Sequence, residues 1–356
     1  MSDFINQVEP DITLEDIENV SKYMNSGAWI TEHKQSEVLA SMIKDKVGRT
    51  YSTFVPNGTI AIYLSILANN LDNGKRIAVP NLTMIATINA VLWANSIPVL
   101  VDTDESLCMS LEALKKENDL DGAIFVPLNG RTGSGLEIEK YCDEAKITLI
   151  EDSAHALGSK YEKKSCGSLG NTSIFSFTPH KIITMGQGGL VLTDSEEVFH
   201  KIQSLKLFNR NKDKMDWHDG FGLNFKITDL QASLGISQFA RLENYIINKK
   251  NNYKIISDTR SDNYHFISFN DYETPWFNDI VFSSIQAKEE FQNKFKENNI
   301  ETREFYPALS YQGYLSKYRT DRLSYSENVF AKLLWLPSSN NLSKQQIEKI
   351  KLVLTS

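Results

Sequence analysis

A lysine between two apolar segments is the residue of this chain best placed for covalent chemistry. The segment SIFSFTPHKIITMGQGGLVLTD, residues 173–194, carries Lys181 in a loop that follows Phe177 and ends at the glycines before Leu190. The flanking runs predict buried strands, and the glycines allow tight backbone packing beside the loop. A lysine held at a buried sheet edge tends to have a lowered pKa, which suits a Schiff-base amine. A solvated surface charge is the common alternative for any lysine.

Two adjacent carboxylates and a histidine follow another apolar run. The segment IEDSAHALG places Glu151 and Asp152 at the end of that run, with His155 three residues beyond Asp152. Ligands of open parallel sheets bind beyond the carboxyl ends of the strands. Because side chains alternate along a strand, Glu151 and Asp152 cannot both face such a ligand. Two interpretations of Asp152 stay open, a helix N-cap and a ligand-binding group.

Two further segments have the composition of turns that lead into helices. In PNGTIAIYL, residues 56–64, a turn at Gly58 precedes Thr59, which opens an apolar helix. Free N–H groups at a helix start attract anions such as phosphate, and glycine lets an anion approach the backbone. In WHDGFGLNFKIT, residues 217–228, Asn224 precedes a predicted helix. Taken alone, each segment is explained as well by an ordinary capped helix and its loop.

Short apolar runs alternate with helical periodicity through the first two thirds of the chain. The predicted strands are 76–80, 98–102, 122–128, 147–152, 173–177 and 188–194. The predicted helices between them are 84–94, 111–116 and 137–145. This alternation predicts an α/β fold with a mostly parallel central sheet flanked by helices. The loop between the last two strands is too short for a crossover helix, so these two strands are predicted to be antiparallel neighbours.

A long helical pattern that begins at Thr228 marks the predicted boundary between two domains. Thr228 is the predicted N-cap, and a helix of this length often leaves one domain and enters the next. We place the boundary near Tyr245, which gives a large domain over 1–245 and a smaller α/β domain over 246–356. The elements predicted for the smaller domain are a strand at 280–285 and helices at 288–299, 324–334 and 343–354.

Composition and charge argue against several classes of protein. The chain has 356 residues, 41% hydrophobic and 23% charged, which suffices for a large folded core. A net charge of -7 gives no reason to expect a nucleic-acid partner. A short basic stretch, KLFNRNKDK at 206–214, is expected to be a solvated surface.

The N-terminus and the cysteines indicate a cytoplasmic protein. The first residues, MSDFINQVEP, lack a signal-peptide pattern, and no apolar run is long enough to span a membrane. The three cysteines, Cys108, Cys142 and Cys166, are far apart and odd in number. This favours free thiols in a reducing compartment over a disulfide framework or a cysteine-based metal site.

Taken together, the segments resemble the DegT/DnrJ/EryC1/StrS family of sugar aminotransferases, which have the aspartate-aminotransferase fold (fold type I). The resemblance covers nearly the whole chain, from about Ser26 to the final predicted helix. The family motif contains Ser-Phe, then the cofactor lysine, then Thr-x-Gly-x-Gly-Gly. The matching residues are Ser176, Phe177, Lys181, Thr184, Gly186, Gly188 and Gly189. A second family pattern, Glu-Asp-x-Ala-x-Ala-x-Gly, is matched at 151–158.

Within that family, three stretches are most similar to the GDP-perosamine synthases and other 4-amino sugar synthases. They are VPNLTMIATINAV, WHDGFGLNFKITDLQASLG and NIETREFYPAL. The resemblance implies that pyridoxal 5'-phosphate (PLP) assists transfer of an amino group from L-glutamate to a nucleotide-linked 4-keto-6-deoxy sugar. One alternative is an aminotransferase for another small ketone, such as a cyclitol, a 3-keto sugar or a phosphorylated triose. A PLP-binding protein that has lost turnover is the other.

The resemblance also implies a role for individual residues. Lys181 would form the Schiff base with PLP and carry the proton, and Asp152 would pair with the pyridine nitrogen. His155 would lie near the 3'-hydroxyl, and Met84 stands where the family usually has an aromatic residue over the ring. The phosphate ligands implied are Gly58, Thr59, Ser176 and, from the second subunit of a homodimer, Asn224. The substrate-binding residues implied at the mouth of the site are Trp29, Arg303 and Tyr306.

Overall fold

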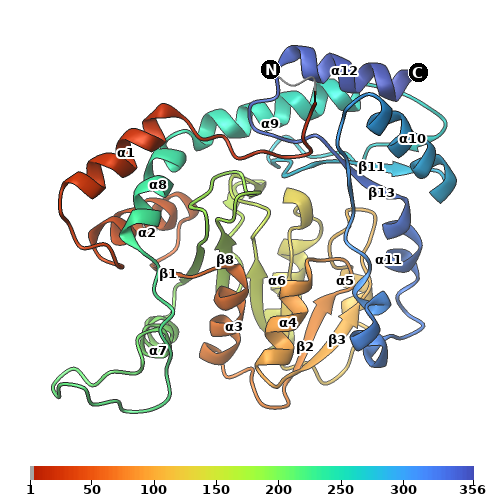
Figure 1. Cartoon of the computed structure of the whole chain (residues 1–356). Helices are drawn as coiled ribbons and strands as arrows, with labels where there is room; N and C mark the ends of the chain where they lie inside the picture. The colour runs from red at the N-terminus through yellow and green to blue at the C-terminus, as the bar shows by residue number, and fades with distance from the viewer. Residues whose placement is uncertain (1–3) are drawn as a thin grey trace.

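A seven-stranded sheet forms the centre of the computed structural model, which describes residues 4–356 (Figure 1). In spatial order its strands are β1 (Tyr51–Val55), β9 (Gly189–Thr193), β8 (Thr172–Ser176), β5 (Thr148–Asp152), β4 (Gly122–Phe125), β2 (Arg76–Pro80) and β3 (Ile97–Val101). Within this sheet only β9 runs against the other strands, since β1 and β8 are both antiparallel to it. The predicted mostly parallel sheet and the antiparallel pairing of β8 with β9 are therefore confirmed.

Helices and loops bury the central sheet, which explains why its strands are continuous apolar runs. Every residue of β4 and β9 is buried. The helices of this part of the chain are α1 (Leu14–Asn25), α2 (Lys34–Val47), α3 (Gly58–Ala68), α4 (Ile85–Trp93), α5 (Leu111–Leu114), α6 (Gly135–Ala145) and α7 (Glu196–Lys206). A small two-stranded sheet consists of β6 (Lys160–Tyr161) and β7 (Lys164–Ser165).

The pattern predicted as one long helix after Thr228 forms two helices. These are α8 (Asp229–Ala240) and α9 (Leu242–Ser257), separated at Arg241, whose φ of -97° and ψ of 1° leave the helical region. Figure 1 shows α9 running across the top of the molecule, away from α8. A break of one residue does not disturb the helical periodicity, so the sequence pattern did not reveal it. The predicted N-cap is confirmed, because the Thr228 hydroxyl accepts the N–H of Gln231.

The C-terminal third contains a four-stranded antiparallel sheet. Its strands, in spatial order, are β10 (Tyr264–His265), β11 (Asn278–Phe282), β13 (Leu333–Leu336) and β12 (Arg303–Glu304). Its helices are α10 (Ile285–Glu297), α11 (Ser324–Val329) and α12 (Lys344–Thr355). The 3₁₀ turns within residues 4–356 are at Leu128–Gly130, Leu309–Tyr311, Gly313–Tyr318 and Phe330–Lys332. The fold is thus α/β with a smaller second sheet.

The helix predicted over 324–334 is wrong in its second half. The α-helical part ends at Val329, and a 3₁₀ turn at Phe330–Lys332 follows. The chain then enters β13, which pairs with both β11 and β12. All four residues of β13 are buried in this sheet. Ladder hydrogen bonds from two neighbouring strands outweigh the local helical pattern, and such tertiary contacts do not appear in a single-sequence periodicity.

The first described residues pack on this second sheet. Ile5 forms a parallel bridge with Ile300, and the N–H of Gln7 donates to Glu301 Oε2 at 2.9 Å. In Figure 1 the first described residues accordingly run beside α12, the last helix of the chain. The division of the chain near Tyr245 remains a prediction.

The basic stretch at 206–214 is not uniformly a solvated surface. Lys206 is fully buried, and its Nζ contacts Glu32 Oε1 at 2.5 Å and the carbonyl oxygen of Phe54 at 2.7 Å. The expectation was wrong for this residue, because an opposite charge and backbone acceptors compensate its burial. The chain after α7 then leaves the body of the molecule as an extended segment (Figure 1). Over residues 4–356, no helix combines the length and apolarity needed to cross a membrane.

Candidate active site

A cavity of about 440 Å³ lies at the carboxyl ends of the central strands, where β2, β5 and β8 lead into loops. Ligands of open α/β sheets bind at this edge. Nine residues singled out from the sequence line it: Gly58, Thr59, Met84, Asp152, His155, Ser176, Lys181, Arg303 and Tyr306. Segments far apart in the chain are therefore brought to one place.

Lys181 and Asp152 form the charged centre of this cavity. Asp152 ends β5 and is 4% exposed, whereas Lys181 lies in the loop between β8 and β9 and faces the cavity. Burial lowers the pKa of Lys181 to about 7, although the negative charge of Asp152 acts in the opposite direction. Lys181 thus has an amine that is readily deprotonated near neutral pH, as a nucleophilic lysine requires.

Thr87 of α4 holds the carboxylate of Asp152. Its hydroxyl donates to Asp152 Oδ2 at 2.8 Å, and the N–H of Ala154 lies 3.3 Å from Oδ1. Burial raises the pKa of Asp152, while these two hydrogen bonds and the charge of Lys181 favour the ionised form. Glu151 points to the other side of the sheet, where Tyr161 and the backbone bind it. The expectation that only one of the two carboxylates faces the cavity is therefore correct.

His155 is an uncharged ring at the wall of the cavity. Its Nδ1 lies 3.4 Å from the N–H of Asn129, and its ring stacks on Trp276 at a centroid distance of 3.7 Å. Burial, followed by the positive charges of Lys181 and Arg303, lowers the pKa of His155 well below its ordinary value. A neutral imidazole can donate or accept a hydrogen bond without adding charge to the site.

The start of α3 closes the cavity on another side and is suited to a phosphate. Asn57 caps the helix by accepting the N–H of Ile60 at 3.0 Å, which leaves the N–H groups of Gly58 and Thr59 for an outside acceptor. A Cβ at Gly58 would lie 3.1 Å from Cβ of Ser176. Glycine therefore lets the helix start approach the serine closely, and backbone N–H groups and a hydroxyl converge.

These residues fit PLP by the chemistry of their side chains. An aldehyde needs an amine, which Lys181 supplies, and a pyridine nitrogen needs a buried carboxylate, which Asp152 supplies. The N–H groups at the helix start of Gly58 can donate hydrogen bonds to a phosphate.

The mouth of the cavity is formed by a cation, a phenol and a thioether. The guanidinium of Arg303 lies 5.3 Å over the ring of Trp335, and its charge lowers the pKa of both Lys181 and His180. Burial raises the pKa of Tyr306, so its hydroxyl keeps its proton. Met84 is 42% exposed and presents a polarizable side chain to the cavity.

Two residues from the sequence analysis do not line the cavity of their own chain. Trp29 is 67% exposed, and its indole N–H donates to the hydroxyl of Thr31. Asn224 lies at the end of the extended segment that follows α7, where its backbone bridges Leu207.

Sequence reasoning did not identify Thr87 and Trp276. Thr87 lies in VPNLTMIATINAV, a stretch singled out only for its resemblance, and no spacing relates it to Asp152. Trp276 belongs to the segment before β11 and reaches Lys181 only through the tertiary fold. The sequence held no local signal for either contact.

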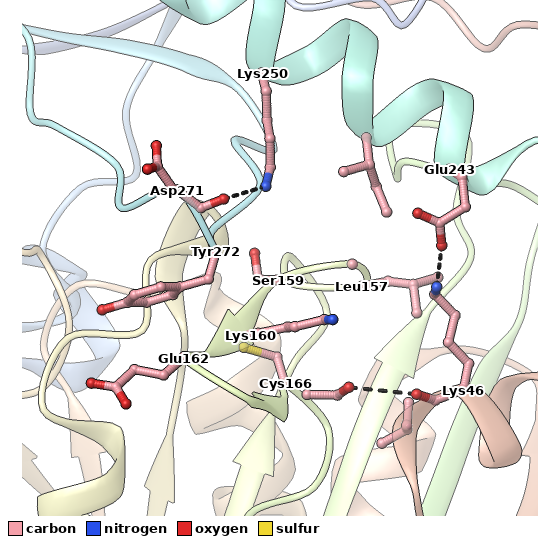
Figure 2. Close-up of a pocket in the computed structure, with 14 residues that line it drawn as sticks. Lys46, Leu157, Ser159, Lys160, Glu162, Cys166, Glu243, Lys250, Asp271 and Tyr272 are labelled. Carbon is pink, nitrogen blue, oxygen red and sulfur yellow. Dashed lines mark hydrogen bonds and ion pairs between the residues drawn. The ribbon is translucent and has the colours of Figure 1, made fainter.

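A second hollow, of about 360 Å³, also contains lysines but has different chemistry (Figure 2). Lys46 pairs there with Glu243, and Lys250 donates to the carbonyl oxygen of Asp271 at 2.7 Å. Burial raises the pKa of the Cys166 thiol at its floor well above the ordinary value, so this thiol is not a ready nucleophile. Lys46 and Lys250 are thus engaged by a carboxylate and a carbonyl oxygen, whereas Lys181 faces the cavity at the central sheet.

The comparison with protein families agrees with this chemistry. The model of the DegT/DnrJ/EryC1/StrS aminotransferase family matches residues 10–354. The chain belongs to this family. It is accordingly a PLP-dependent aminotransferase of fold type I, as the sequence predicted.

Individual relatives of this family member extend over nearly its whole length. The chain is 29% identical to the GDP-perosamine synthase of Escherichia coli O157:H7, over 97% of this chain and 96% of the relative. It is 28% identical to the GDP-perosamine synthase of Vibrio cholerae, over 93% and 94%. Among solved structures, Helicobacter pylori PseC, an aminotransferase involved in the biosynthesis of pseudoaminic acid, superimposes with a TM-score of 0.92. That alignment has 21% identity and covers 99% of this chain and 98% of PseC.

Proposed function

We propose that this aminotransferase converts a nucleotide-linked 4-keto-6-deoxy sugar into the corresponding 4-amino sugar, with L-glutamate as the amino donor and GDP as the preferred nucleotide. The observation that carries the proposal is the cavity in which Lys181 and Asp152 face each other beneath a cationic mouth. The two GDP-perosamine synthases that match nearly the full chain support the choice of sugar and nucleotide.

In this proposal the residues of the cavity divide the work of a transamination. PLP, when bound, supplies a ring that withdraws electrons from the reacting carbon. Asp152, held by Thr87, keeps the ring nitrogen protonated, and Lys181 Nζ first holds the cofactor and then moves the proton. The N–H groups of Gly58 and Thr59, with the hydroxyl of Ser176, bind the phosphate.

The remaining cavity residues orient the cofactor ring. In a bound PLP the imidazole of His155 would lie near the 3'-hydroxyl, and Met84 would pack over the ring. Both side chains line the same cavity as Lys181, which supports these assignments. The neutral state of the imidazole suits a hydrogen bond to the ring substituent.

We assign Arg303 and Tyr306, which line the cavity, to the sugar nucleotide. A substrate contact by Trp29, which does not line the cavity of its own chain, stays a prediction of the resemblance. A diphosphate carries two negative charges, and the charge of Arg303 already acts on Lys181 and His180 inside the cavity. Replacement Arg303→Ala should raise KM for the nucleotide sugar about tenfold, and should affect the half-reaction with glutamate much less. Equal loss in both half-reactions would contradict a substrate contact. Arg303→Lys is the matched variant, because it keeps the charge and loses the planar fork.

We further propose a homodimer in which Asn224 serves the phosphate site of the second subunit. The extended segment that carries it exposes Met215, Trp217 and Phe221, which are 95%, 56% and 71% exposed. Apolar side chains on a protruding segment support burial against a second copy. Mixed Lys181→Ala and Asn224→Ala subunits should regain activity, because one of the two sites in a heterodimer then carries neither change. A fully active monomer in sedimentation would contradict this arrangement.

The free and buried state of Cys108, Cys142 and Cys166 supports the cytoplasm as the place of action. No nucleic acid and no membrane enter the reaction as we propose it. Its reactants are L-glutamate and the keto-sugar.

The proposed substrate is tested with purified protein, L-glutamate and 4-keto-6-deoxy sugars linked to GDP, UDP or dTDP. Mass spectrometry should find the 4-amino product and 2-oxoglutarate, with the highest rate for the GDP sugar. Amination of a cyclitol, a 3-keto sugar or a phosphorylated triose without any nucleotide 4-keto sugar would select the other substrate class. Absence of 2-oxoglutarate with every acceptor would select a PLP-binding protein without turnover.

A further inference from the structure

Trp276 comes from the C-terminal third of the chain, yet its side chain touches the loop that carries Lys181. It is 3% exposed and precedes β11 in the sequence. Its indole N–H donates to the carbonyl oxygen of His180 at 2.8 Å, and His180 immediately precedes Lys181. Nζ of Lys181 lies 4.4 Å from the centroid of the same ring. One side chain thus contacts both the backbone before the lysine and the lysine amine.

The backbone of Trp276 is itself fixed on both sides. Its N–H donates to the carbonyl oxygen of Asn129 at 3.0 Å, and its own carbonyl oxygen accepts Nζ of Lys249 at 2.7 Å. Its ring also stacks on His155. A side chain with so many constraints has little freedom to move, which is the condition for positioning a neighbour.

We propose that Trp276 is a positioning residue for Lys181: its N–H fixes the peptide before the lysine, and its ring face holds the amine at the cavity. The inference rests on the proposed role of Lys181 and deepens it. An ammonium group is attracted to the face of an indole ring, so the ring opposes the effect of burial on the lysine. Core packing would require some acceptor for the buried indole N–H, but neither an acceptor on the residue before Lys181 nor the approach of the amine.

Hydrogen exchange tests the contact between Trp276 and the lysine loop. Trp276→Phe keeps an aromatic face and removes the N–H donor, so amide exchange over residues 178–184 should become faster. The matched control is Trp335→Phe, because the indole N–H of Trp335 is buried with no hydrogen-bond partner among the described residues. Because the ring of Trp335 contacts that of Trp276 at a centroid distance of 5.7 Å but donates no hydrogen bond to the loop, its effect on the same peptide should be much smaller. Equal exchange in wild type and Trp276→Phe, or equal acceleration in both variants, would overturn the positioning role.

Competitive labelling tests the contact between the ring face and the amine. Lys181 in the full chain without cofactor is acetylated with acetic anhydride across a pH series. Mass spectrometry gives the pH at which its acetylation rate is half the maximum, which is called the midpoint below. Trp276→Leu should have a midpoint about 0.5–1 pH unit below that of Trp276→Phe, because only phenylalanine offers a ring face to the ammonium. A leucine midpoint equal to or above the phenylalanine midpoint would overturn this part. If Trp276→Leu does not fold, the exchange experiment decides alone.

A final step separates this inference from the proposed function. Wild-type protein is incubated with PLP and reduced with borohydride, and the modified lysine is mapped. If Lys181 is modified but neither the exchange nor the labelling experiment shows the expected effect of replacing Trp276, only the role of Trp276 fails. If Lys181 is not modified, the proposed function fails with it.

Discussion

Two lysines of this protein, Lys181 and Lys249, have nearly the same tendency to lose a proton in very different surroundings. Burial lowers the pKa of each to about 7. Nζ of Lys249 donates to the carbonyl oxygens of Trp276 and Ser338, and it joins two segments of the C-terminal third. Nζ of Lys181 instead lies beside an aromatic face and faces a cavity that it shares with Asp152.

The difference shows that a lowered pKa does not by itself identify a reactive lysine. The amine of Lys249 is engaged with acceptors inside packed protein, at 5% exposure, and has no room for a reaction partner. The amine of Lys181 has the room, a nearby carboxylate and a helix start that suits a phosphate. Space and neighbouring groups, rather than acidity, therefore separate the proposed catalytic lysine from the structural one.

The largest expected effect is that of Lys181→Ala. Turnover of glutamate with the keto-sugar should fall by roughly 10³-fold or more, because the group that moves the proton is gone. The melting temperature should change little, since Lys181 lies at a cavity and not in packed core. A variant with near-normal turnover would remove Lys181 from the mechanism.

Asp152→Asn should have the next largest effect. An amide cannot keep the ring nitrogen protonated, so activity should fall by roughly 10²–10⁴-fold while the protein remains folded. Steady-state kinetics and thermal unfolding measure the two quantities separately. Loss of folding with retained specific activity would instead assign Asp152 to the capping of the following turn, where Ala154 N–H is its contact.

Thr87→Val should give a smaller and more specific change. Loss of the hydroxyl removes a hydrogen bond that favours ionised Asp152, so the pKa of that carboxyl should rise further. Because activity needs the carboxylate and is lost as pH falls through its pKa, the acid limb of the activity profile should move up by about 1 pH unit. Thr87→Ser should return the acid limb of the activity profile to its wild-type pH. An unmoved limb in the valine variant would show that Thr87 does not act through Asp152.

Lys249→Met should affect stability far more than activity, because it reaches the cavity only through the backbone of Trp276. Two carbonyl oxygens lose a donor, which should destabilise the fold by about 1–3 kcal/mol. Since the folded pKa of about 7 lies below the ordinary lysine value of 10.5, the unfolded wild type binds more protons between these values. Wild-type stability therefore gains with rising pH in this window, and the variant lacks that gain. Urea unfolding at two pH values gives the difference in free energy of unfolding between wild type and Lys249→Met. This difference should increase with pH, and a decrease would contradict the account.

The sequence predicted six of the seven strands of the central sheet, all but β1, and the charged pair, because each depends on local features. Strands such as β5 and β9 are uninterrupted apolar runs, and their predicted bounds differ from the observed ones by one residue at each end or less. Lys181 and Asp152 stand in short motifs at sheet ends, where the fold must expose them to a ligand.

What could not be predicted depends on contacts between distant segments. The break at Arg241 and the entry into β13 are imposed by packing partners that no periodicity reveals. Thr87 and Trp276 join the site because α4 and the segment before β11 meet the loops of the sheet. Such contacts follow from the completed fold, so a single sequence without its fold does not identify them.

The central claim is that Lys181, and not another buried lysine, bonds to the cofactor. The most direct measurement is reduction of the PLP-loaded protein with borohydride, digestion, and mass-spectrometric mapping of the modified lysine. The peptide that contains Lys181 should carry the phosphopyridoxyl group, and the peptide that contains Lys249 should be unmodified. Modification of Lys249 or of any other lysine, with Lys181 left free, would contradict the account.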